Sequence, residues 1–254
     1  MEAAQGTRQE SEHRVAEQHY GDDYIKWKNW GVGSFGAIRK SDKAYFSAEI
    51  RKTGRSLNNG ASVLEIGFGN GSFLRYALQQ HWDVRGTELN AELVEMARAS
   101  GFNATHTQDL SSFADATFEL VVAFDVLEHL PQDSLRGFIL EVKRILRPGG
   151  HFIARFPNGD SPLGLPNQNG DVTHITTIGS GKARYFAAQC GMDIIFLGGE
   201  AQPILGASAL HSIHSLTTLP IRKTIDFLLN AIFFPRANMT FCSSNMVMIY
   251  RKPE

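Results

Sequence analysis

The segment from Val63 to Phe73 places an apolar run directly before three glycines, Gly67, Gly69 and Gly71, on alternate positions. The apolar run contains β-branched residues and is typical of a buried strand, and a helical pattern begins immediately after the glycines. Glycine is needed in such a turn because a Cβ would restrict the backbone and hold a ligand away from it. The segment therefore predicts a strand, a tight turn and a helix, which form the first half of a βαβ unit.

The glycine spacing separates this turn from the dinucleotide-binding fingerprint. That fingerprint reads G-x-G-x-x-G, whereas this chain reads G-x-G-x-G. Glu65 stands two positions before the first glycine, where a carboxylate would repel a pyrophosphate but suits a cationic ligand. Glu88 ends the next apolar segment, and a carboxylate at the tip of a second strand can accept hydrogen bonds from both ribose hydroxyls. A nucleoside that lacks phosphates and bears a cation is S-adenosylmethionine (SAM).

Residues 65–71 resemble the first motif of the class I SAM-dependent methyltransferases. The likeness continues in the family's order through residues 109–110, 118–130 and 146–150, and it covers residues 60 to 200. Within the class, the chain is similar to methyltransferases of the type 11/12 kind and to small-molecule and glycan O-methyltransferases. The resemblance implies a doubly wound, Rossmann-like α/β fold with a seven-stranded, mostly parallel sheet, and it implies SAM as the cofactor.

Composition limits the class of protein further. A chain of 254 residues is long enough for one α/β domain with additions and too short for two large domains. Hydrophobic residues make up 43% and charged residues 20%, as in ordinary soluble proteins, and a net charge of −1 does not indicate a nucleic-acid partner. The two cysteines, Cys190 and Cys242, fit a reducing cytoplasm and lack metal-ligand spacing. We therefore predict a cytoplasmic protein.

Three parts are predicted along the chain. Residues 1–18 form a polar tail without the apolar core of a signal peptide. Residues 19–58 form a lid or cap segment, and residues 59–254 form the methyltransferase domain, in which 201–240 is a helical insertion. No apolar run approaches the ~20 residues that a membrane-spanning helix requires.

The lid segment is rich in aromatic residues, which include Tyr24, Trp27 and Trp30, interleaved with lysines and glycines. One interpretation is that these rings pack an N-terminal extension onto the core. The other is a movable cover over the cofactor and acceptor, a role that this segment commonly has in methyltransferases of the class. On the second interpretation, these three residues contact the acceptor. A helix is predicted after them, over 42–51.

From residue 62 onwards, strand and helix patterns alternate regularly. The predicted strands are 62–66, 83–88, 103–107, 120–124, 151–156, 192–197 and 245–251, and the predicted helices are 72–80, 91–99, 132–146 and 182–189. We expect a turn at 147–150, because proline cannot continue a helix, and a loop over 157–172. Such alternation predicts a parallel sheet with helices on both faces and ligands at the carboxyl ends of the strands.

The resemblance and the positions of the motifs assign the cofactor contacts. The three glycines would let the backbone approach the methionine moiety, Glu65 would orient that turn and the amino group, and Glu88 would hold the ribose. Asp109 lies where family members use a carboxylate to accept from the adenine amino group, and Asp125 ends the fourth strand beside the same cleft. For each carboxylate the alternative is a helix cap or a solvated surface position. The full predicted cofactor set is Glu65, Gly67, Phe68, Gly69, Gly71, Glu88, Leu89, Asp109, Leu110 and Asp125.

Methyl transfer to a hydroxyl requires alignment of the acceptor, exclusion of water and removal of a proton. His174 lies in a run that resembles the histidine-containing segment of small-molecule and sugar O-methyltransferases, so it is a candidate base or acceptor-orienting residue; the alternative is a structural histidine. Gly179 departs from the threonine that relatives often carry at the next helix start. His129 is a second catalytic candidate, for which we favour a structural role near the cofactor. Asn158, in the loop after the fifth strand, is a candidate acceptor contact.

The insertion carries an amphipathic stretch, 221–234, which Pro220 is expected to open and Pro235 to close. Either it covers the sheet edge or forms a dimer contact, or its apolar face rests on a membrane surface or a lipid-linked acceptor. His211 and His214 lie in the insertion without a carboxylate or cysteine at metal spacing, so no metal site is predicted.

These features predict methyl transfer from SAM to an oxygen of a small molecule. By analogy with glycan-modifying relatives, the favoured acceptor is a sugar hydroxyl in surface-polysaccharide or other glycan biosynthesis. A quinone precursor or a natural product is an alternative acceptor. A protein of another class, a SAM-binding interaction subunit without catalysis, is the remaining alternative.

Overall fold

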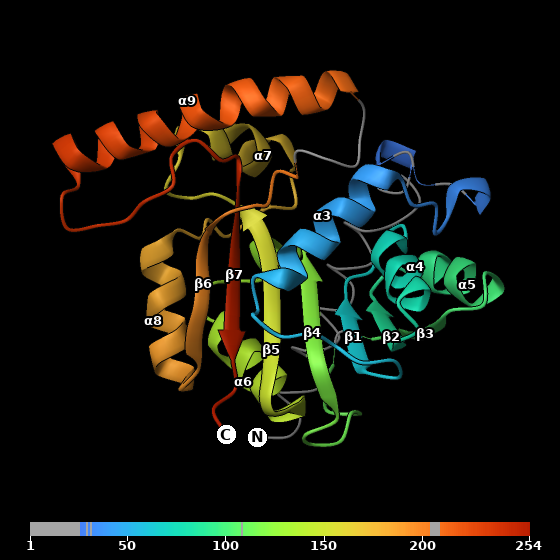
Figure 1. Cartoon of the computed structure of the whole chain (residues 1–254). Helices are drawn as coiled ribbons and strands as arrows, with labels where there is room; N and C mark the ends of the chain where they lie inside the picture. The colour runs from blue at the N-terminus through green and yellow to red at the C-terminus, as the bar shows by residue number, and fades with distance from the viewer. Residues whose placement is uncertain (1–25, 29, 31, 108, 204–208) are drawn as a thin grey trace.

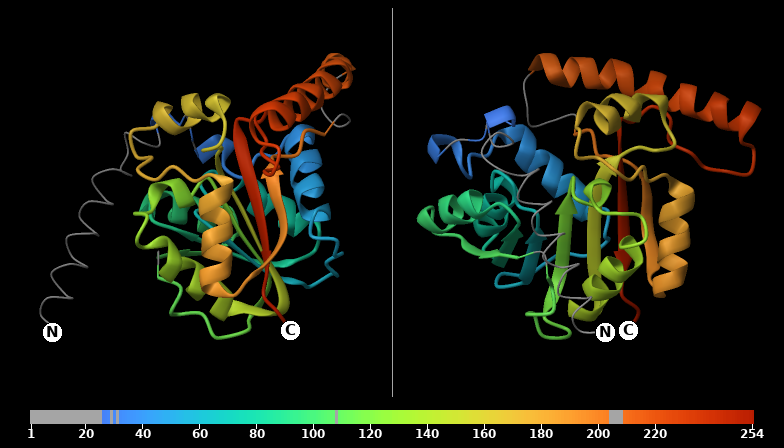
Figure 2. Two further views of the ribbon diagram at one scale, coloured as in Figure 1. Left: turned by 90° about the vertical axis from the view of Figure 1, so that its left-hand side faces the viewer. Right: turned by 180° about the vertical axis from the view of Figure 1, so that it is seen from behind.

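The computed structural model describes residues 26–254 except 29, 31, 108 and 204–208. The predicted polar tail and Tyr24 lie outside the described residues. Within them, the chain forms a layered α/β fold in which helices cover both faces of one sheet (Figures 1 and 2).

The sheet has seven strands in the order β3-β2-β1-β4-β5-β7-β6. Strands β1 to β5 pair in parallel, and β7 runs antiparallel to both β5 and β6. The strands are β1 (Ser62–Ile66), β2 (Asp83–Glu88), β3 (Asn103–His106), β4 (Phe118–Phe124), β5 (Leu146–Pro157), β6 (Asp193–Gly199) and β7 (Asn245–Arg251). This confirms the predicted seven-stranded, mostly parallel sheet. The chain order reverses between β1 and β4, and in open α/β sheets ligands bind at such a switch point.

Two apolar layers hold the helices against the sheet. The helices α3 (Lys40–Arg51), α4 (Ser72–Gln79) and α5 (Ala91–Ala99) pack on one face, and α6 (Leu135–Ile145) and α8 (Ser180–Cys190) pack on the other. In β4, Val121 and Val122 are both 0% exposed yet belong to opposite layers. A strand buried on both faces is apolar at successive positions, which is why β4 reads as a continuous apolar run in the sequence.

Several predicted boundaries are confirmed where local chemistry fixes them. The strands β1, β2 and β7 and the helix α5 begin and end at the predicted residues. The Asn90 side chain caps α5 by accepting a hydrogen bond from Leu93 N over 3.0 Å, and Gly101 follows the helix with a φ of 82°. The cap and the left-handed glycine are strong local signals.

The segment predicted as a turn, 147–150, lies inside β5, which begins at Leu146, although Gly149 has the left-handed φ of 69° that a turn favours. A shift of register between Phe118 and Leu120 of β4 accommodates Pro148 and the glycines that follow it. Gly149 N donates to Lys252 O over 2.9 Å, and Lys252 N donates to Gly150 O over 2.9 Å. Pairing with the C-terminal end therefore incorporates a turn-forming sequence into an inner strand as a bulge.

The segments around β5 also differ from the prediction. The helix expected over 132–146 is shorter, and a separate 3-10 turn, η2 (Leu127–His129), precedes it. The expected loop over 157–172 contains a 3-10 turn, η3 (Pro162–Gly164), and a short helix, α7 (Leu165–Gly170). The helix predicted over 182–189 begins two residues earlier, at Ser180. Gly179 offers no side-chain cap, and Asp160 Oδ2 takes the place of the family's threonine by accepting from Ser180 N over 2.9 Å.

The helix of the insertion, α9 (Ala209–Phe233), is longer than predicted and includes Pro220 in its interior. Because this stretch is exposed, the carbonyl that loses its partner at Pro220 can bond to water, so the proline does not open the helix as predicted. Figure 1 shows α9 lying across the end of the molecule above α7, away from the edges of the sheet. Its apolar residues stay exposed, for example Phe227 at 71%, so it does not cover the sheet edge.

Polar contacts hold α9 to the segment that returns to β7. The Asp226 carboxylate accepts from Phe241 N and Cys242 N over 2.8 and 2.9 Å, and Asn230 bonds with Met239 through both side-chain atoms. Across the described ranges, no helix combines the length and apolarity needed to cross a membrane.

Candidate functional site

A large cavity of about 1440 Å³ opens at the carboxyl ends of β1, β2 and β4. Most of the predicted cofactor residues line it, and so do Trp30 and His129. The predicted residues on its wall are Glu65, Gly67, Phe68, Gly69, Glu88, Leu89, Asp109, Leu110 and Asp125. The structure therefore brings to one cavity residues that the sequence distributes over four strands.

The glycine turn adopts the left-handed backbone that its sequence predicts. Gly67, Gly69 and Gly71 have φ angles of 65°, 51° and 72°. A Cβ at Gly69 would lie 2.9 Å from the Trp30 ring, and a Cβ at Gly71 would lie 2.7 Å from the Phe35 ring. Both the conformation and the close approach of these rings require glycine at those positions.

Glu65 is a buried carboxyl group at the base of this turn. The residue is 4% exposed, and its Oε2 atom has no hydrogen-bond partner among the described residues. Burial, with a smaller contribution from the charge of Glu88, raises the pKa of Glu65 well above its ordinary value. A buried carboxyl oxygen without a donor beside a cavity suits a cationic ligand group, which would supply the missing donor.

Glu88 ties the end of β2 to the glycine turn. Its Oε2 accepts from Gly69 N over 3.1 Å, and its Oε1 accepts from Leu89 N and Asn90 N over 2.7 and 3.2 Å. Burial raises the pKa of Glu88, and these backbone donors oppose that shift. Two carboxylate oxygens offer about four acceptor positions, so the group retains capacity for a ligand hydroxyl.

Asp109 and Leu110 form the part of the wall that follows β3. The Asp109 carboxylate accepts from Ser111 N over 2.8 Å and from the Ser111 hydroxyl, and these bonds lower the pKa of Asp109. Leu110 is 3% exposed and packs in the core layer of α6. Asp109 thus stabilises its own turn, and its contact with an adenine amino group remains a prediction.

Asp125 forms an ion pair that the sequence analysis did not anticipate. Arg155 Nε donates to Asp125 Oδ1 over 2.9 Å, and a second nitrogen of the guanidinium donates to Oδ2. The Arg155 guanidinium also lies 5.3 Å from the centre of the Tyr45 ring. Tyr45 and Arg155 both line the cavity, and the only sequence signal for this pair is that both charges end neighbouring strands.

The N-terminal segment lies over the glycine turn. Gly36 N donates to Asn70 O over 2.7 Å, and the Trp30 ring approaches Gly69. Lys28 Nζ is 3.0 Å from Asp171 Oδ2, so the segment also reaches the loop before α8. Trp27 is 57% exposed and does not line the cavity. Movement of this segment as a lid remains a prediction.

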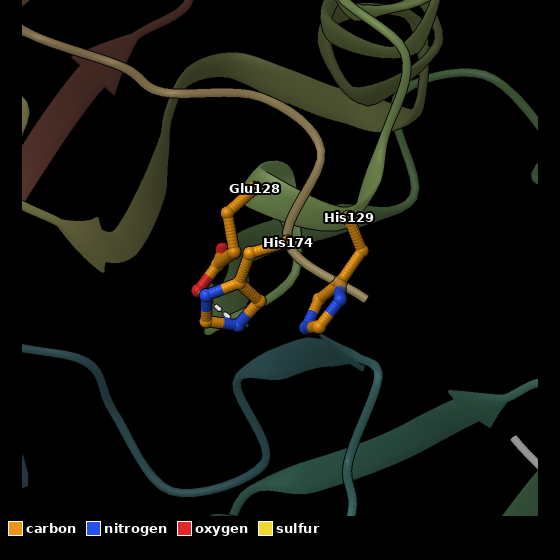
Figure 3. A group of neighbouring side chains, drawn as sticks. All are labelled: Glu128, His129 and His174. Atoms are coloured by element: carbon orange, nitrogen blue, oxygen red, sulfur yellow. Dashed lines mark ion pairs between the residues drawn. The ribbon is translucent and has the colours of Figure 1, made fainter. Parts of the chain in front are cut away.

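His129 and His174 lie together, but only His129 is on the cavity wall. The centres of their rings are 4.6 Å apart, and the His174 side chain is 8% exposed (Figure 3). The His129 Nδ1 atom is 3.2 Å from the carbonyl oxygen of Thr173. Burial, together with the neighbouring His174, lowers the pKa of His129 to about 4, so the ring is neutral near pH 7. His174 itself is not on the cavity wall, and its role as a base or acceptor-orienting residue remains a prediction.

Glu128 completes this cluster and was missed by sequence reasoning. One ligand atom from each of Glu128, His129 and His174 lies within 4.8 Å of the other two. The three residues come from η2 and from the loop before α8, which are far apart in the sequence (Figure 3). The histidines weighed for a metal site from the sequence were His211 and His214, and the side chain of His211 lies outside the described residues.

Asn158 does not face the cavity, and its assignment as an acceptor contact is wrong. The residue is 1% exposed, and its side-chain nitrogen donates to the carbonyl oxygens of Thr240 and Ser243 over 2.7 and 3.0 Å. Its side-chain oxygen accepts from Asp160 N over 3.0 Å. A buried side chain whose groups all bond to backbone is structural.

The described residues fit SAM. The backbone of the glycine turn and Glu88 lie on the cavity wall, where they would contact the methionine moiety and the ribose, and the orphaned Glu65 oxygen lacks a donor that an ammonium group can supply.

Comparison with known proteins agrees with this fit. Residues 64–154 match the family model of a methyltransferase domain. Ubiquinone biosynthesis O-methyltransferases from Pectobacterium atrosepticum and Xanthomonas oryzae are 28% and 29% identical to the chain over 100 and 99 residues. Each alignment covers 36% of this chain and 41% of the relative, so the chain matches less than half the length of these curated relatives.

Solved structures share the fold. A SAM-dependent methyltransferase from Archaeoglobus fulgidus has a TM-score of 0.61 at 19% identity and covers 83% of this chain and 94% of its own. Geranyl diphosphate methyltransferase in complex with SAM has a TM-score of 0.55 at 14% identity, with coverages of 83% and 85%. A [4+2]-cyclase has a TM-score of 0.54 at 15% identity, with coverages of 82% and 80%, so the same architecture serves more than one reaction.

Proposed function

We propose that this chain, which carries a class I SAM-dependent methyltransferase domain, transfers the methyl group of SAM to a hydroxyl of a small molecule. The observation that carries the proposal is the buried Glu65 oxygen, which has no hydrogen-bond partner among the described residues and lies at the base of a glycine turn on a cavity wall. SAM, when bound, supplies a methyl group activated by its sulfonium. The chain must hold the cofactor, align the acceptor and exclude water.

Cofactor binding is divided among three parts of the wall. The glycine turn and Glu65 hold the amino-acid end of SAM, because the turn permits close approach and the carboxyl group attracts the ammonium. Glu88 holds the ribose, and the wall at Asp109 and Leu110 receives the adenine ring. Trp30 lies against Gly69, so the N-terminal segment covers the turn and shields the cavity from water at that point.

The acceptor hydroxyl binds beside His129, which is on the cavity wall and neutral near pH 7. The wall also carries Lys28, Trp30 and the Asp125–Arg155 ion pair. Charged groups and an indole ring favour a polyhydroxyl acceptor, because sugars bind through hydrogen bonds and stack on aromatic faces. We therefore keep a sugar hydroxyl in glycan biosynthesis as the first acceptor class.

A second acceptor class is favoured by the relatives. The curated proteins that match the chain are ubiquinone biosynthesis O-methyltransferases, so an aromatic hydroxyl of a quinone precursor is the alternative. The exposed apolar face of α9 would suit an acceptor with a lipid tail.

A transfer assay with methyl-labelled SAM tests this proposal. The acceptors are a panel of sugar nucleotides and, separately, dihydroxybenzoates with and without an alkyl tail. The panel whose compounds incorporate the labelled methyl group identifies the acceptor class.

Glu65→Gln should weaken cofactor binding by about tenfold, because a neutral amide replaces a charge-assisted partner. Glu95→Gln, on the exposed side of α5, is the matched control and should change nothing. Cofactor binding without transfer to either panel would favour a non-catalytic SAM-binding subunit.

A further inference from the structure

We propose that Glu128, His129 and His174 bind a divalent transition-metal ion at the wall of the cavity. The ion would lie beside the place where the proposed function puts the acceptor hydroxyl, and an oxygen of the acceptor could take one of its open coordination positions. The proposal adds a component to that site, but metal binding can be measured without any methyl transfer.

The three side chains are already gathered by rigid backbone contacts. Ile175 N and Thr176 N each donate to Glu128 O over 3.0 Å, and the Thr176 hydroxyl donates to Leu130 O over 2.6 Å. These bonds fasten the loop that carries His174 to η2, which carries Glu128 and His129. Figure 3 shows the three side chains extending in the same direction from these two segments. A cluster held in this way needs little ordering when an ion binds.

Glu128 is the strongest indication that a ligand is missing from this cluster. The residue is 0% exposed, and neither carboxyl oxygen has a hydrogen-bond partner among the described residues. His174 Nε2 is 3.8 Å from Glu128 Oε1, which is too long for a hydrogen bond. Buried carboxyl groups are normally hydrogen-bonded, paired or bound to a metal. A cation in contact with Glu128 would compensate for its burial.

His129 is held in the tautomer that a metal requires. His129 Nδ1 lies 3.2 Å from the Thr173 carbonyl oxygen and 3.0 Å from the Thr173 hydroxyl oxygen. The hydroxyl donates its own hydrogen to Asp171, so both oxygens accept from Nδ1, which carries the ring hydrogen and leaves the lone pair on Nε2. Metal-binding histidines commonly donate their other ring hydrogen to a backbone carbonyl in this way. The Thr173 hydroxyl bonds to Asp171, whose carboxylate is also held by Lys28. Asp171 is therefore an outer partner of the cluster, 3.6 Å from His174 Nε2.

The ligand set selects the class of metal. Two imidazoles and one carboxylate suit zinc and neighbouring transition metals, whereas calcium and magnesium prefer oxygen ligands. Bond lengths of about 2.0–2.2 Å require the three ligand atoms to draw together from their present spacing, by small rotations of the side chains. Three protein ligands leave at least one coordination position open, which is the arrangement of catalytic rather than structural metal sites.

The test is a metal titration of the full chain after treatment with EDTA and dialysis. Calorimetry with Zn²⁺ and Mn²⁺ gives the affinity, and the visible absorption of added Co²⁺ reports nitrogen coordination. We expect one ion per chain. We expect Glu128→Gln and His174→Gln to weaken binding by at least about 100-fold, and Thr173→Val by about tenfold, as typical for loss of an outer partner. His151→Gln, which removes a buried histidine from another part of the sheet, should bind as the wild type does.

Two outcomes would overturn the proposal. One is a folded wild-type protein that binds none of the three ions at about 1 mM, a concentration at which even a weak site would fill. The other is unchanged binding by Glu128→Gln and His174→Gln, which would place the ion elsewhere. Thermal unfolding of the metal-free variants shows whether each one folds. Titration of the metal-free protein with S-adenosylhomocysteine separates this result from the proposed function, because the cofactor residues do not include the metal ligands.

Discussion

Asp125 and Arg155 are joined by a two-point ion pair at the carboxyl ends of the adjacent strands β4 and β5. Asp125 has a left-handed φ of 58°, and its backbone N–H donates to Arg155 O over 2.9 Å. The guanidinium also lies over the rings of Tyr45 and Phe124, at 5.3 and 5.5 Å from their centres. Backbone, charge and ring contacts thus fix one wall of the cavity before any ligand binds.

Arg155→Lys should lower the free energy of unfolding by about 1–2 kcal/mol, because lysine cannot form a planar two-point pair or stack on both rings. The expected loss of unfolding free energy is no larger because 46% of the Asp125 side chain is exposed, and solvent weakens the ion pair there. Urea unfolding measures the change. Arg251→Lys, in an exposed pair with Asp193, is the control and should cost less than about 0.5 kcal/mol. Equal losses of unfolding free energy in the two variants would show that the Arg155–Asp125 pair stabilises the protein no more than an exposed ion pair does.

Gly69→Ala should impair both the fold and cofactor binding. A left-handed alanine costs about 1–2 kcal/mol, and its Cβ would meet the Trp30 ring at 2.9 Å. Gly101→Ala is the matched control, since Gly101 has a φ of 82° and nothing within 4 Å of its Cβ position. Titration with S-adenosylhomocysteine should show loss of affinity only for Gly69→Ala. Equal affinities in the two variants would mean that the glycine turn does not approach the cofactor.

Asn158→Ala should destabilise the protein by about 2–3 kcal/mol, because two carbonyls and one N–H in a buried place lose their partner. Cofactor affinity of the folded variant should be unchanged. Asn167→Ala, which removes an exposed contact with Asn245, should cost less than about 0.5 kcal/mol. Chemical denaturation distinguishes the two. A large loss of acceptor binding without loss of stability would restore Asn158 to the acceptor site.

His151 should make the protein less stable in acid. Burial, with the charges of Arg55 and Arg251, lowers the pKa of His151 to about 4, whereas the unfolded chain titrates at about 6.5. Between these values the unfolded state binds more protons, so stability is present above pH 6.5 and is lost as the pH falls towards 4. From pH 7 to pH 5 the wild type should lose about 1–2 kcal/mol more than His151→Gln does. Parallel losses in the two proteins would contradict the shift.

The central sheet and its cofactor edge could be predicted because their signals are local. Val63 to Gly71 specify a strand and a left-handed turn by themselves, and Asn90 marks a helix start through its own side chain. The wrong predictions involve partners distant in the sequence. The 147–150 segment is part of β5 because Gly149 and Gly150 pair with Lys252, and Asn158 is structural because residues 240 and 243 supply its acceptors.

The acceptor side was less predictable for the same reason. His174 was identified as a candidate, but only the folded chain shows that its ring lies 4.6 Å from the His129 ring and that Glu128 lies beside it. Arg155 falls within the predicted strand 151–156 and received no functional assignment, because nothing near it in the sequence reveals its pair with Asp125. Local chemistry thus predicted the cofactor half of the cavity better than the half formed by loops that meet through tertiary contacts.

The proposed methyl transfer requires that the chain bind SAM. Calorimetric titration of the purified chain with S-adenosylhomocysteine measures this binding directly. We expect micromolar affinity in the wild type and a loss of about 10- to 100-fold in Glu88→Ala, since charge-assisted hydrogen bonds to the ribose disappear. Glu92→Ala, on the exposed first turn of α5, should bind as the wild type does. A folded wild-type protein that binds no S-adenosylhomocysteine, or a Glu88→Ala variant that binds equally well, would contradict the account.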